Sequence, residues 1–133
     1  MTIRLGKHVA RIEDNILFFY LFGDLETNEL LEYIQLTSRI ISVHGSFSIA
    51  DDLSHFGTAA PTVRRTVVDW LRTAPCRGVV LYGGSIAART LVTLMLGAMK
   101  LIGTLKFPAA IVRNEQEARD WLATHQNSDA ATN

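Results

Sequence analysis

The stretch FSIADDLSHFGTAAPTVRR, residues 47–65, decides the fold. It begins with an alternating run of Phe47, Ile49 and Leu53, a pattern typical of a strand. A short polar turn is expected at residues 54–58. A helical pattern then begins near Pro61 and places apolar residues on one face, namely Val63, Val67, Trp70 and Leu71. A strand, a loop and a helix in series indicate a parallel α/β sheet, in which binding sites lie where strands end and helices begin.

The composition predicts one domain with a single well-filled core, because the chain has 133 residues and is 48% hydrophobic. Its 13 Lys and Arg balance 13 Asp and Glu, and the basic residues do not cluster in the sequence. We therefore expect no nucleic-acid partner, because such partners usually require a clustered basic face. The single cysteine, Cys76, excludes an internal disulfide and a cysteine-based zinc cluster. The first residues lack the apolar core of a signal peptide, so we expect a cytoplasmic protein.

Patterns along the whole chain predict five strands and four helices in the order ββαβαβαβα. The expected strands are residues 2–12, 16–22, 47–52, 78–82 and 105–112. The expected helices run from residues 24–28 to about 43, from 59 to 74, from 86 to 102, and onward from about 114. The ribbon 2–12 is one strand, or two short strands broken near Gly6.

The first two strands are close enough to pair as an antiparallel hairpin, and Asp14 and Asn15 suit the turn between them. Each later crossover carries one helix, so the remaining strands should be parallel. Pro108 favours an edge position for the last strand because proline lacks an N–H donor. Residues 1–125 are expected to form one domain, and residues 126–133 a flexible tail.

Several short motifs follow one another along nearly the whole chain in an order typical of a known family. They are Gly23-Asp24-Leu25, Asp52-Leu53-Ser54, Arg64, Gly84-Ser85 with Arg89, and Glu115-x-Glu117-Ala118-x-x-Trp121-Leu122. With the element order, they resemble STAS domains, the fold of SpoIIAA-type anti-sigma factor antagonists. The resemblance is to the SpoIIAA-like branch of bacterial proteins, which is related to CRAL-TRIO lipid-carrier domains. It implies a five-stranded, mostly parallel mixed sheet with four helices, and a regulatory or protein-binding role.

The chain departs from that family's phosphorylation motif. SpoIIAA-type antagonists carry a phosphorylated serine in an Asp-Ser-Ser-Gly turn before the second helix, whereas residues 57–62 here read GTAAPT. Thr58 and Thr62 are the nearby hydroxyls, and Thr58 is the expected N-cap of the second helix. We therefore expect no phosphorylation switch, and partner binding through residues 54–60 and the second helix, including Arg64, without modification.

The polar residues at the end of the third expected strand have two interpretations. Asp51 and Asp52 look like a paired carboxylate, but neighbours on a strand point to opposite faces, so Asp52 is expected to accept hydrogen bonds from the loop. Ser54 and His55 suggest a nucleophile and a base, yet adjacent residues rarely reach the geometry of such a pair. We interpret Asp52, Ser54, His55 and Thr58 as candidates for ligand or partner binding rather than catalysis.

The segment Gly83-Gly84-Ser85 is the strongest candidate for binding a small ligand. Glycines allow close approach of the backbone, and free N–H groups at a helix start attract anions. Arg89, one turn inside the helix, would add positive charge. The alternative is a tight turn in which Ser85 caps the helix. The sequence predicts no metal site and no cofactor.

The third expected helix is apolar on nearly all sides, although its apolar run is too short to span a bilayer. Candidates for a dimer face or for the wall of an apolar ligand pocket are Leu91, Met95, Met99 and Ile102. We expect a non-enzymatic STAS-like regulatory or protein-interaction module that forms a homodimer. The alternative is a carrier or sensor of a small apolar or acyl ligand, and an enzyme is the third hypothesis.

Overall fold

The computed structural model describes the backbone of residues 2–132 and the side chains of residues 2–125. The expected tail, residues 126–133, lies outside the described side chains. The elements follow in the order β1 (Thr2–Leu5), β2 (His8–Glu13), β3 (Ile16–Leu25), α1 (Thr27–His44), β4 (Phe47–Ala59), α2 (Pro61–Thr73), β5 (Cys76–Tyr82), α3 (Ile86–Leu101), β6 (Ala109–Val112) and α4 (Glu115–Thr132).

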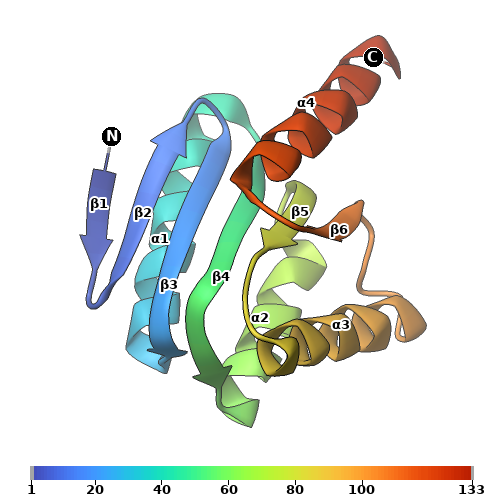
Figure 1. Ribbon diagram of the computed structural model, residues 1–133. Helices are drawn as coiled ribbons and strands as arrows, with labels where there is room; N and C mark the ends of the chain where they lie inside the picture. Colours follow the sequence, from blue (N-terminus) through green and yellow to red (C-terminus); the bar gives the residue numbers. More distant parts are fainter. Residues whose placement is uncertain (1, 133) are drawn as a thin grey trace.

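The strands form one six-stranded mixed sheet in the order β1-β2-β3-β4-β5-β6 (Figure 1). The pairs β1–β2 and β2–β3 are antiparallel, and β3 to β6 are parallel. The predicted α/β class and four helices are confirmed, but the prediction of five strands is wrong. The N-terminal ribbon is two strands because Gly6 adopts a φ of 60°, which reverses the chain before Lys7.

Strand β4 is much longer than predicted, because residues 54–59 continue the strand instead of forming a polar turn. Its pairing with β3 shifts register twice, between Tyr20 and Phe22 and between Gly23 and Leu25. Such shifts bend a strand and allow polar residues to remain in it. Helix α2 then begins directly, with Ala60 as N-cap and Pro61 in the first turn, so the prediction that Thr58 is the N-cap is wrong.

The predicted last strand, residues 105–112, shortens to β6, and Pro108 lies just before it. Strand β6 is at the edge of the sheet, as Pro108 led us to expect. Strand β5 begins earlier than predicted, at Cys76.

The helices cover the two faces of the sheet unequally (Figure 1). Side chains from α1, α2 and α3 share the main apolar core with one face, and α4 packs with a smaller cluster on the other. The sequence patterns predict a mostly buried core of eleven residues, namely Phe18, Tyr20, Leu30, Ile34, Ile49, Val67, Val80, Leu94, Ile111, Trp121 and Leu122. Of these, Phe18, Leu30, Ile49, Val80 and Leu122 are buried. A further group is half-buried, comprising Tyr20, Ile34, Val67, Ile111 and Trp121.

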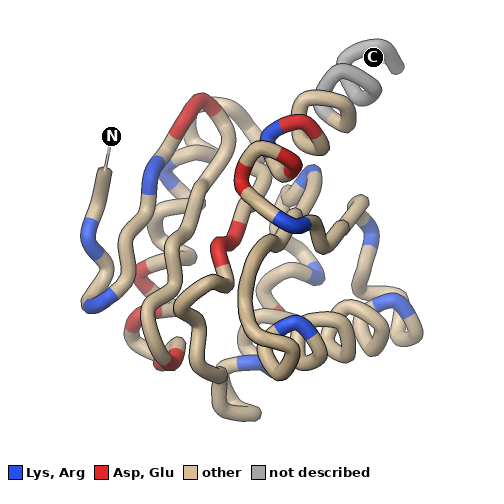
Figure 2. The backbone as a smooth tube through the Cα atoms, in the orientation of Figure 1, with Lys and Arg blue, Asp and Glu red and all other residues tan. Residues whose placement is uncertain are grey.

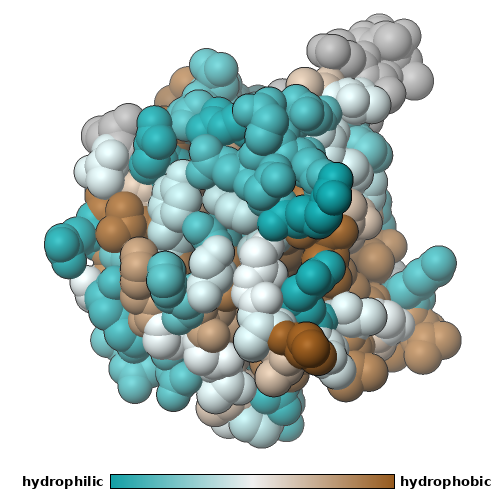
Figure 3. All heavy atoms as spheres, viewed as in Figure 1, coloured by the Kyte–Doolittle hydropathy of each residue, from teal (hydrophilic) through white to brown (hydrophobic). Residues whose placement is uncertain are grey.

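Helix α3 is buried on one side only, through Ala88, Val92 and Met99. Leu94, expected in the core, is 67% exposed, and that prediction is wrong because none of the elements that the structure describes covers the outer side of α3. Hydrophobic residues gather over α3 at the lower right of Figure 3. The exposed large apolar side chains of this region are Ile86, Leu94, Leu101 and Ile102. Only Lys and Arg mark α3 in Figure 2, where residues 83–112 contain no Asp or Glu.

One buried carboxylate joins the first hairpin to α1. Glu29 accepts hydrogen bonds from Lys7 Nζ at 3.2 Å and contacts His8 Nε2 at 2.9 Å. The Phe22 backbone N–H donates to His8 Nδ1 at 2.9 Å, so Nε2 carries the proton that is donated to Glu29. Glu29 also completes the capping box of α1 by accepting from the Glu26 N–H.

Although burial raises the pKa of Glu29, hydrogen bonds from Glu26, His8 and Lys7 outweigh it and hold the pKa below its usual value.

Candidate ligand-binding site

An apolar cavity of about 120 Å³ lies between the sheet and the three helices of the main core. Strands β3, β4 and β5 form its floor, and side chains of α1, α2 and α3 form its walls. Helix α3 contributes only apolar side chains, namely Val92, Met95, Leu96 and Met99. Cavities of comparable volume lined by aliphatic and aromatic residues stay dry and bind molecules as small as benzene.

Asp51 lines this cavity from the middle of β4. Strand alternation turns its side chain toward the helices together with Ile49 and Leu53, which also line the cavity. Burial in these apolar surroundings raises the pKa of Asp51 to about 7, and the neighbouring Asp52 adds to the rise. The hydrogen bond from Tyr33 acts in the opposite direction. Asp51 therefore changes its charge near neutral pH.

Tyr33 of α1 donates a hydrogen bond to Asp51 Oδ1 at 3.4 Å. Its ring is held by edge contacts with Phe19 and with Trp70, at centroid distances of 4.5 and 5.8 Å. Trp70 in turn stacks on Phe47. Burial raises the pKa of Tyr33 well above its usual value, so the hydroxyl remains a donor. The aromatic side chains give the polar end of the cavity a fixed shape.

Arg64 is the one basic residue among the described side chains that line the cavity. It is half-buried in the first turns of α2, and its Nη1 donates a hydrogen bond to the carbonyl oxygen of Ala59, at the end of β4. This candidate from the sequence therefore lies at the cavity wall, where it ties α2 to β4. It does not form an ion pair with Asp51 among the described residues.

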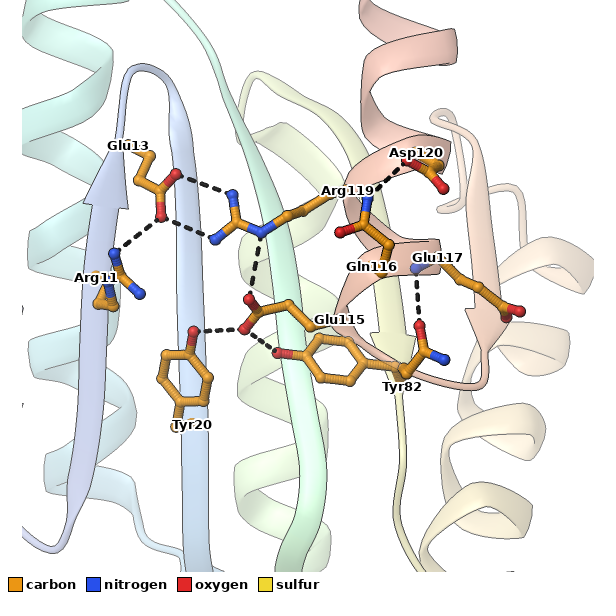
Figure 4. Close-up of polar contacts among 10 residues, drawn as sticks. Arg11, Glu13, Tyr20, Tyr82, Glu115, Gln116, Glu117, Arg119 and Asp120 are labelled. Atoms are coloured by element: carbon orange, nitrogen blue, oxygen red, sulfur yellow. Dashed lines mark hydrogen bonds and ion pairs between the residues drawn. The ribbon is translucent and has the colours of Figure 1, made fainter.

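The opposite face of the sheet carries a hydrogen-bonded polar network beneath α4 (Figure 4). Glu115 accepts hydrogen bonds from the hydroxyls of Tyr20 and Tyr82, at 2.7 and 3.2 Å, and from Arg119 Nε. The Arg119 guanidinium also forms two hydrogen bonds of 3.0 Å with Glu13. The hydrogen bond that Glu115 accepts from Tyr20 outweighs the effect of burial and lowers the pKa of Glu115. These bonds fix α4 on the sheet and satisfy each charge.

Near this network, four of the predicted binding residues come together. Asp52 Oδ1 accepts a hydrogen bond from the Ser54 backbone N–H at 2.9 Å, which confirms its predicted role in binding the following segment. A side chain at Gly83 would meet Ser54 Oγ and Asp52 Oδ1, and one at Gly84 would meet Leu53. Both glycines have positive φ, so the turn lies flat against β4. The close packing of residues 83–84 on β4 therefore explains why glycines occupy both positions.

His55 and Thr58, the other binding candidates predicted after Asp52, contact different residues and do not lie together. His55 is exposed and stacks on Phe22 of β3, with ring centroids 5.3 Å apart. Thr58 is also exposed, and its backbone N–H donates to Asp24 Oδ1 at 3.0 Å. Neither side chain reaches the cavity. No described hydrogen bond joins Ser54 to His55, so no nucleophile and base pair forms there.

Ser85 caps α3 by accepting a hydrogen bond from the Ala88 N–H at 3.1 Å, as the alternative interpretation predicted. Arg89 is exposed and borders a shallow surface hollow on α3. Of the four predicted face residues, Met95 and Met99 line the apolar cavity, Leu91 is half-buried, and Ile102 is 63% exposed. The predicted face is therefore divided between the cavity and the outer surface.

Sequence reasoning did not identify Asp51 and Tyr33 as a pair or find the network around Glu115 and Arg119. The alternation in residues 47–53 contained one useful signal, because it places Asp51 on the same face as Ile49 and Leu53. No group of three His, Cys, Asp or Glu side chains within residues 2–125 could hold a metal ion.

The chain matches no protein-family model and no curated protein. Within residues 2–132, no helix has both the length and the apolar character needed to cross a bilayer.

Proposed function

We propose that the protein is a non-enzymatic, cytoplasmic binding module of the STAS-like kind that holds a small apolar molecule between β4 and helices α1 to α3. The cavity of about 120 Å³ is the observation that carries this proposal. Binding sites for small molecules are mostly apolar with a few placed polar groups. This cavity has that character, because Asp51, Tyr33 and Arg64 are set among aliphatic and aromatic side chains.

The resemblance to SpoIIAA-like proteins implies a regulatory or protein-binding role, and their relation to CRAL-TRIO lipid carriers favours the alternative of a carrier or sensor of an apolar ligand. The element order from β2 to α4 is the order that the resemblance implies, with β1 added at the edge. A non-enzymatic role is supported by the polar side chains around the end of β4, because Asp52 and Asp24 hydrogen-bond to backbone N–H groups of that strand.

Toluene is a suitable first probe because it is apolar and close in size to benzene. We expect saturable binding to the wild type in isothermal titration calorimetry, with chemical-shift changes confined to cavity residues in amide NMR spectra. Val67→Phe replaces a small side chain at the cavity wall with a phenyl ring that occupies the cavity, and should abolish toluene binding. Met95→Phe, at the α3 wall, repeats the test if the first variant does not fold.

Val43→Phe is the matched control, because Val43 is 77% exposed on α1 and receives the same change of side chain. This variant should bind toluene as the wild type does. Equal binding of toluene to Val67→Phe and the wild type, or a wild type that binds neither toluene nor a polar analogue of it, contradicts the proposed function. Native mass spectrometry after gentle purification would identify a retained ligand.

A second candidate function is self-association as a regulatory module, and the outer surface of α3 favours it. Ile86, Leu94 and Leu101 form an exposed apolar stripe, and exposed patches of this kind mark interaction sites. Light scattering coupled to size exclusion should then give a dimer that Leu94→Glu dissociates. Leu31→Glu, on the exposed side of α1, is the control. A monomeric wild type contradicts this candidate.

A further inference from the structure

The carboxyl group of Asp51 has bonding capacity that the protein does not use. Its one hydrogen bond among the described residues is the long contact of 3.4 Å from the Tyr33 hydroxyl. An ionised carboxylate has about four acceptor sites. Because Asp51 borders the cavity, the remaining sites open toward the space that a ligand would occupy. Asp51 is half-buried, and a polar group removed from water is costly unless it has a partner, so this carboxyl favours a ligand that brings one.

None of the other described ionisable groups around Asp51 provides a positive charge that pairs with its carboxylate. On α1, Tyr33 stays protonated because burial raises its pKa. On β5, burial raises the pKa of Cys76 to about 12, so the thiol is neutral. On α2, Arg64 is bonded to the Ala59 carbonyl at the far end of β4. Asp52 lies on the opposite face of the sheet, and α3 contributes no ionisable side chain to the cavity wall.

We propose that the cavity selects a small apolar amine, whose ammonium group binds the Asp51 carboxylate while its hydrocarbon part fills the apolar space. This inference rests on the proposed function and specifies the class of ligand. A hydrocarbon would leave the free acceptor sites of Asp51 unpaired. A carboxylic acid would place a second negative charge beside Asp51, which is unfavourable in apolar surroundings.

The pH dependence of binding follows from the same geometry. Burial raises the pKa of Asp51 to about 7, so the carboxylate form becomes abundant only above neutral pH. An ammonium ligand favours the ionised carboxylate, so amine binding should strengthen from about pH 6 to about pH 8.

The experiment compares benzylamine, toluene and benzoate, which share one ring and differ in the polar group. Calorimetry at about pH 8 should give benzylamine an affinity at least about tenfold higher than that of toluene, the size of a charge-assisted hydrogen bond. Asp51→Asn should remove that preference and leave toluene binding unchanged. Asp52→Asn, one position along β4 on the other face, should preserve toluene binding and most of the preference for benzylamine, because its charge acts on Asp51 only as a lesser cause beside burial.

A measurement on the wild type avoids any variant that fails to fold. The carboxyl carbon resonance of Asp51 reports its titration in NMR spectra. Saturating benzylamine should lower the midpoint by about one pH unit or more, whereas toluene should leave it unchanged or raise it.

The outcomes separate this inference from the function on which it rests. Toluene binding as tight as that of benzylamine, or an unchanged preference in Asp51→Asn, overturns the amine assignment and leaves the apolar binding module standing. Tighter binding of benzoate also overturns it and assigns recognition to Arg64. A cavity that binds none of the three probes overturns both proposals.

Discussion

Asp51 and Asp52 are neighbours in the chain, yet their carboxyl groups lie on opposite faces of the sheet. Asp51 borders the apolar cavity, and Asp52 accepts a hydrogen bond from the Ser54 N–H on the other side. Two identical side chains therefore have different electrostatic surroundings. The pair provides its own internal control for any experiment on the cavity.

The first prediction concerns the pH dependence of stability. The folded-state pKa of Asp51 is raised from 3.8 to about 7, so the folded state binds a proton more tightly than the unfolded state. Its stability should fall as pH rises from about 4 to about 7 and then level off. Asp51→Asn should remove this slope and stabilise the protein above neutral pH by at most about 4 kcal/mol, at about 1.4 kcal/mol per pKa unit.

Urea denaturation of the wild type, Asp51→Asn and Asp52→Asn at several pH values checks this prediction. Asp52→Asn should keep most of the slope of the wild type, because burial is the main cause of the raised Asp51 pKa and the Asp52 charge only adds to it. A wild type equally stable at pH 5 and pH 8 would show that Asp51 is not protonated near neutrality.

The second prediction concerns Glu29. Glu29→Gln removes the carboxylate that pairs with Lys7 and accepts the hydrogen bond from the neutral His8 ring, and should cost about 2 kcal/mol, the scale for a hydrogen bond to a charged group. Glu32→Gln, three residues along the exposed side of the same helix, should change stability by less than about 0.5 kcal/mol.

Because the pKa of Glu29 is lowered in the folded state, its contribution is present above its unfolded pKa and is lost as pH falls. Thermal denaturation at neutral pH and in acid measures this effect. The difference in stability between the wild type and Glu29→Gln should narrow in acid, and a constant difference would contradict the stabilising role assigned to the ionised Glu29 carboxylate.

The third prediction concerns the close packing of Trp121 on β5. A side-chain carbon added at Gly78 would lie 3.2 Å from the Trp121 ring, so Gly78→Ala should displace the indole and cost about 1–3 kcal/mol. Trp121→Ala should cost about 3 kcal/mol, since the ring is half-buried. In the double variant the added methyl group enters vacated space, so the total cost should be less than the sum of the two. Strict additivity in denaturant titrations would mean that the ring does not rest on Gly78.

The fourth prediction concerns phosphorylation. A negative charge on Thr58 would lie close to the Asp24 carboxylate, which binds the Thr58 N–H, so Thr58→Glu should lower the melting temperature. Thr62 lies in the first turn of α2, where a negative charge is favourable, so Thr62→Glu should be neutral or stabilising. We expect phosphopeptide analysis of protein from its own cells to find no phosphate on Thr58 or Thr62. Stoichiometric phosphate on either residue, with loss of partner binding in the corresponding Thr→Glu variant, would restore a phosphorylation switch.

Local signals predicted much of the fold. The glycine after α1, Gly45, adopts the left-handed conformation of a C-cap, and Ser85 caps α3. Alternation in residues 47–53 gives the central strand and the division between Asp51 and Asp52. These features depend on neighbours in the chain, which sequence patterns report directly.

Other features depend on contacts that the sequence does not contain. Polar residues 54–58 stay in a strand because β3 pairs with them through two register shifts. Leu94 is exposed because nothing within the described part of the chain covers that side of α3, although its neighbours along the helix are apolar. The hydrogen bonds of Glu115 come from two strands distant in sequence, so its role could not be read from the start of α4 alone.

Glu29 also determines how the edge of the sheet opens. A hairpin at a sheet edge ordinarily exchanges its amide protons faster than the core, because it frays without disturbing the rest. Here Glu29 binds Lys7 and His8 while capping α1, so opening the hairpin takes two hydrogen-bond partners away from the same carboxylate that caps the helix. The amides of β2 and of the first turn of α1 should therefore exchange at matching rates, as parts of one cooperative unit.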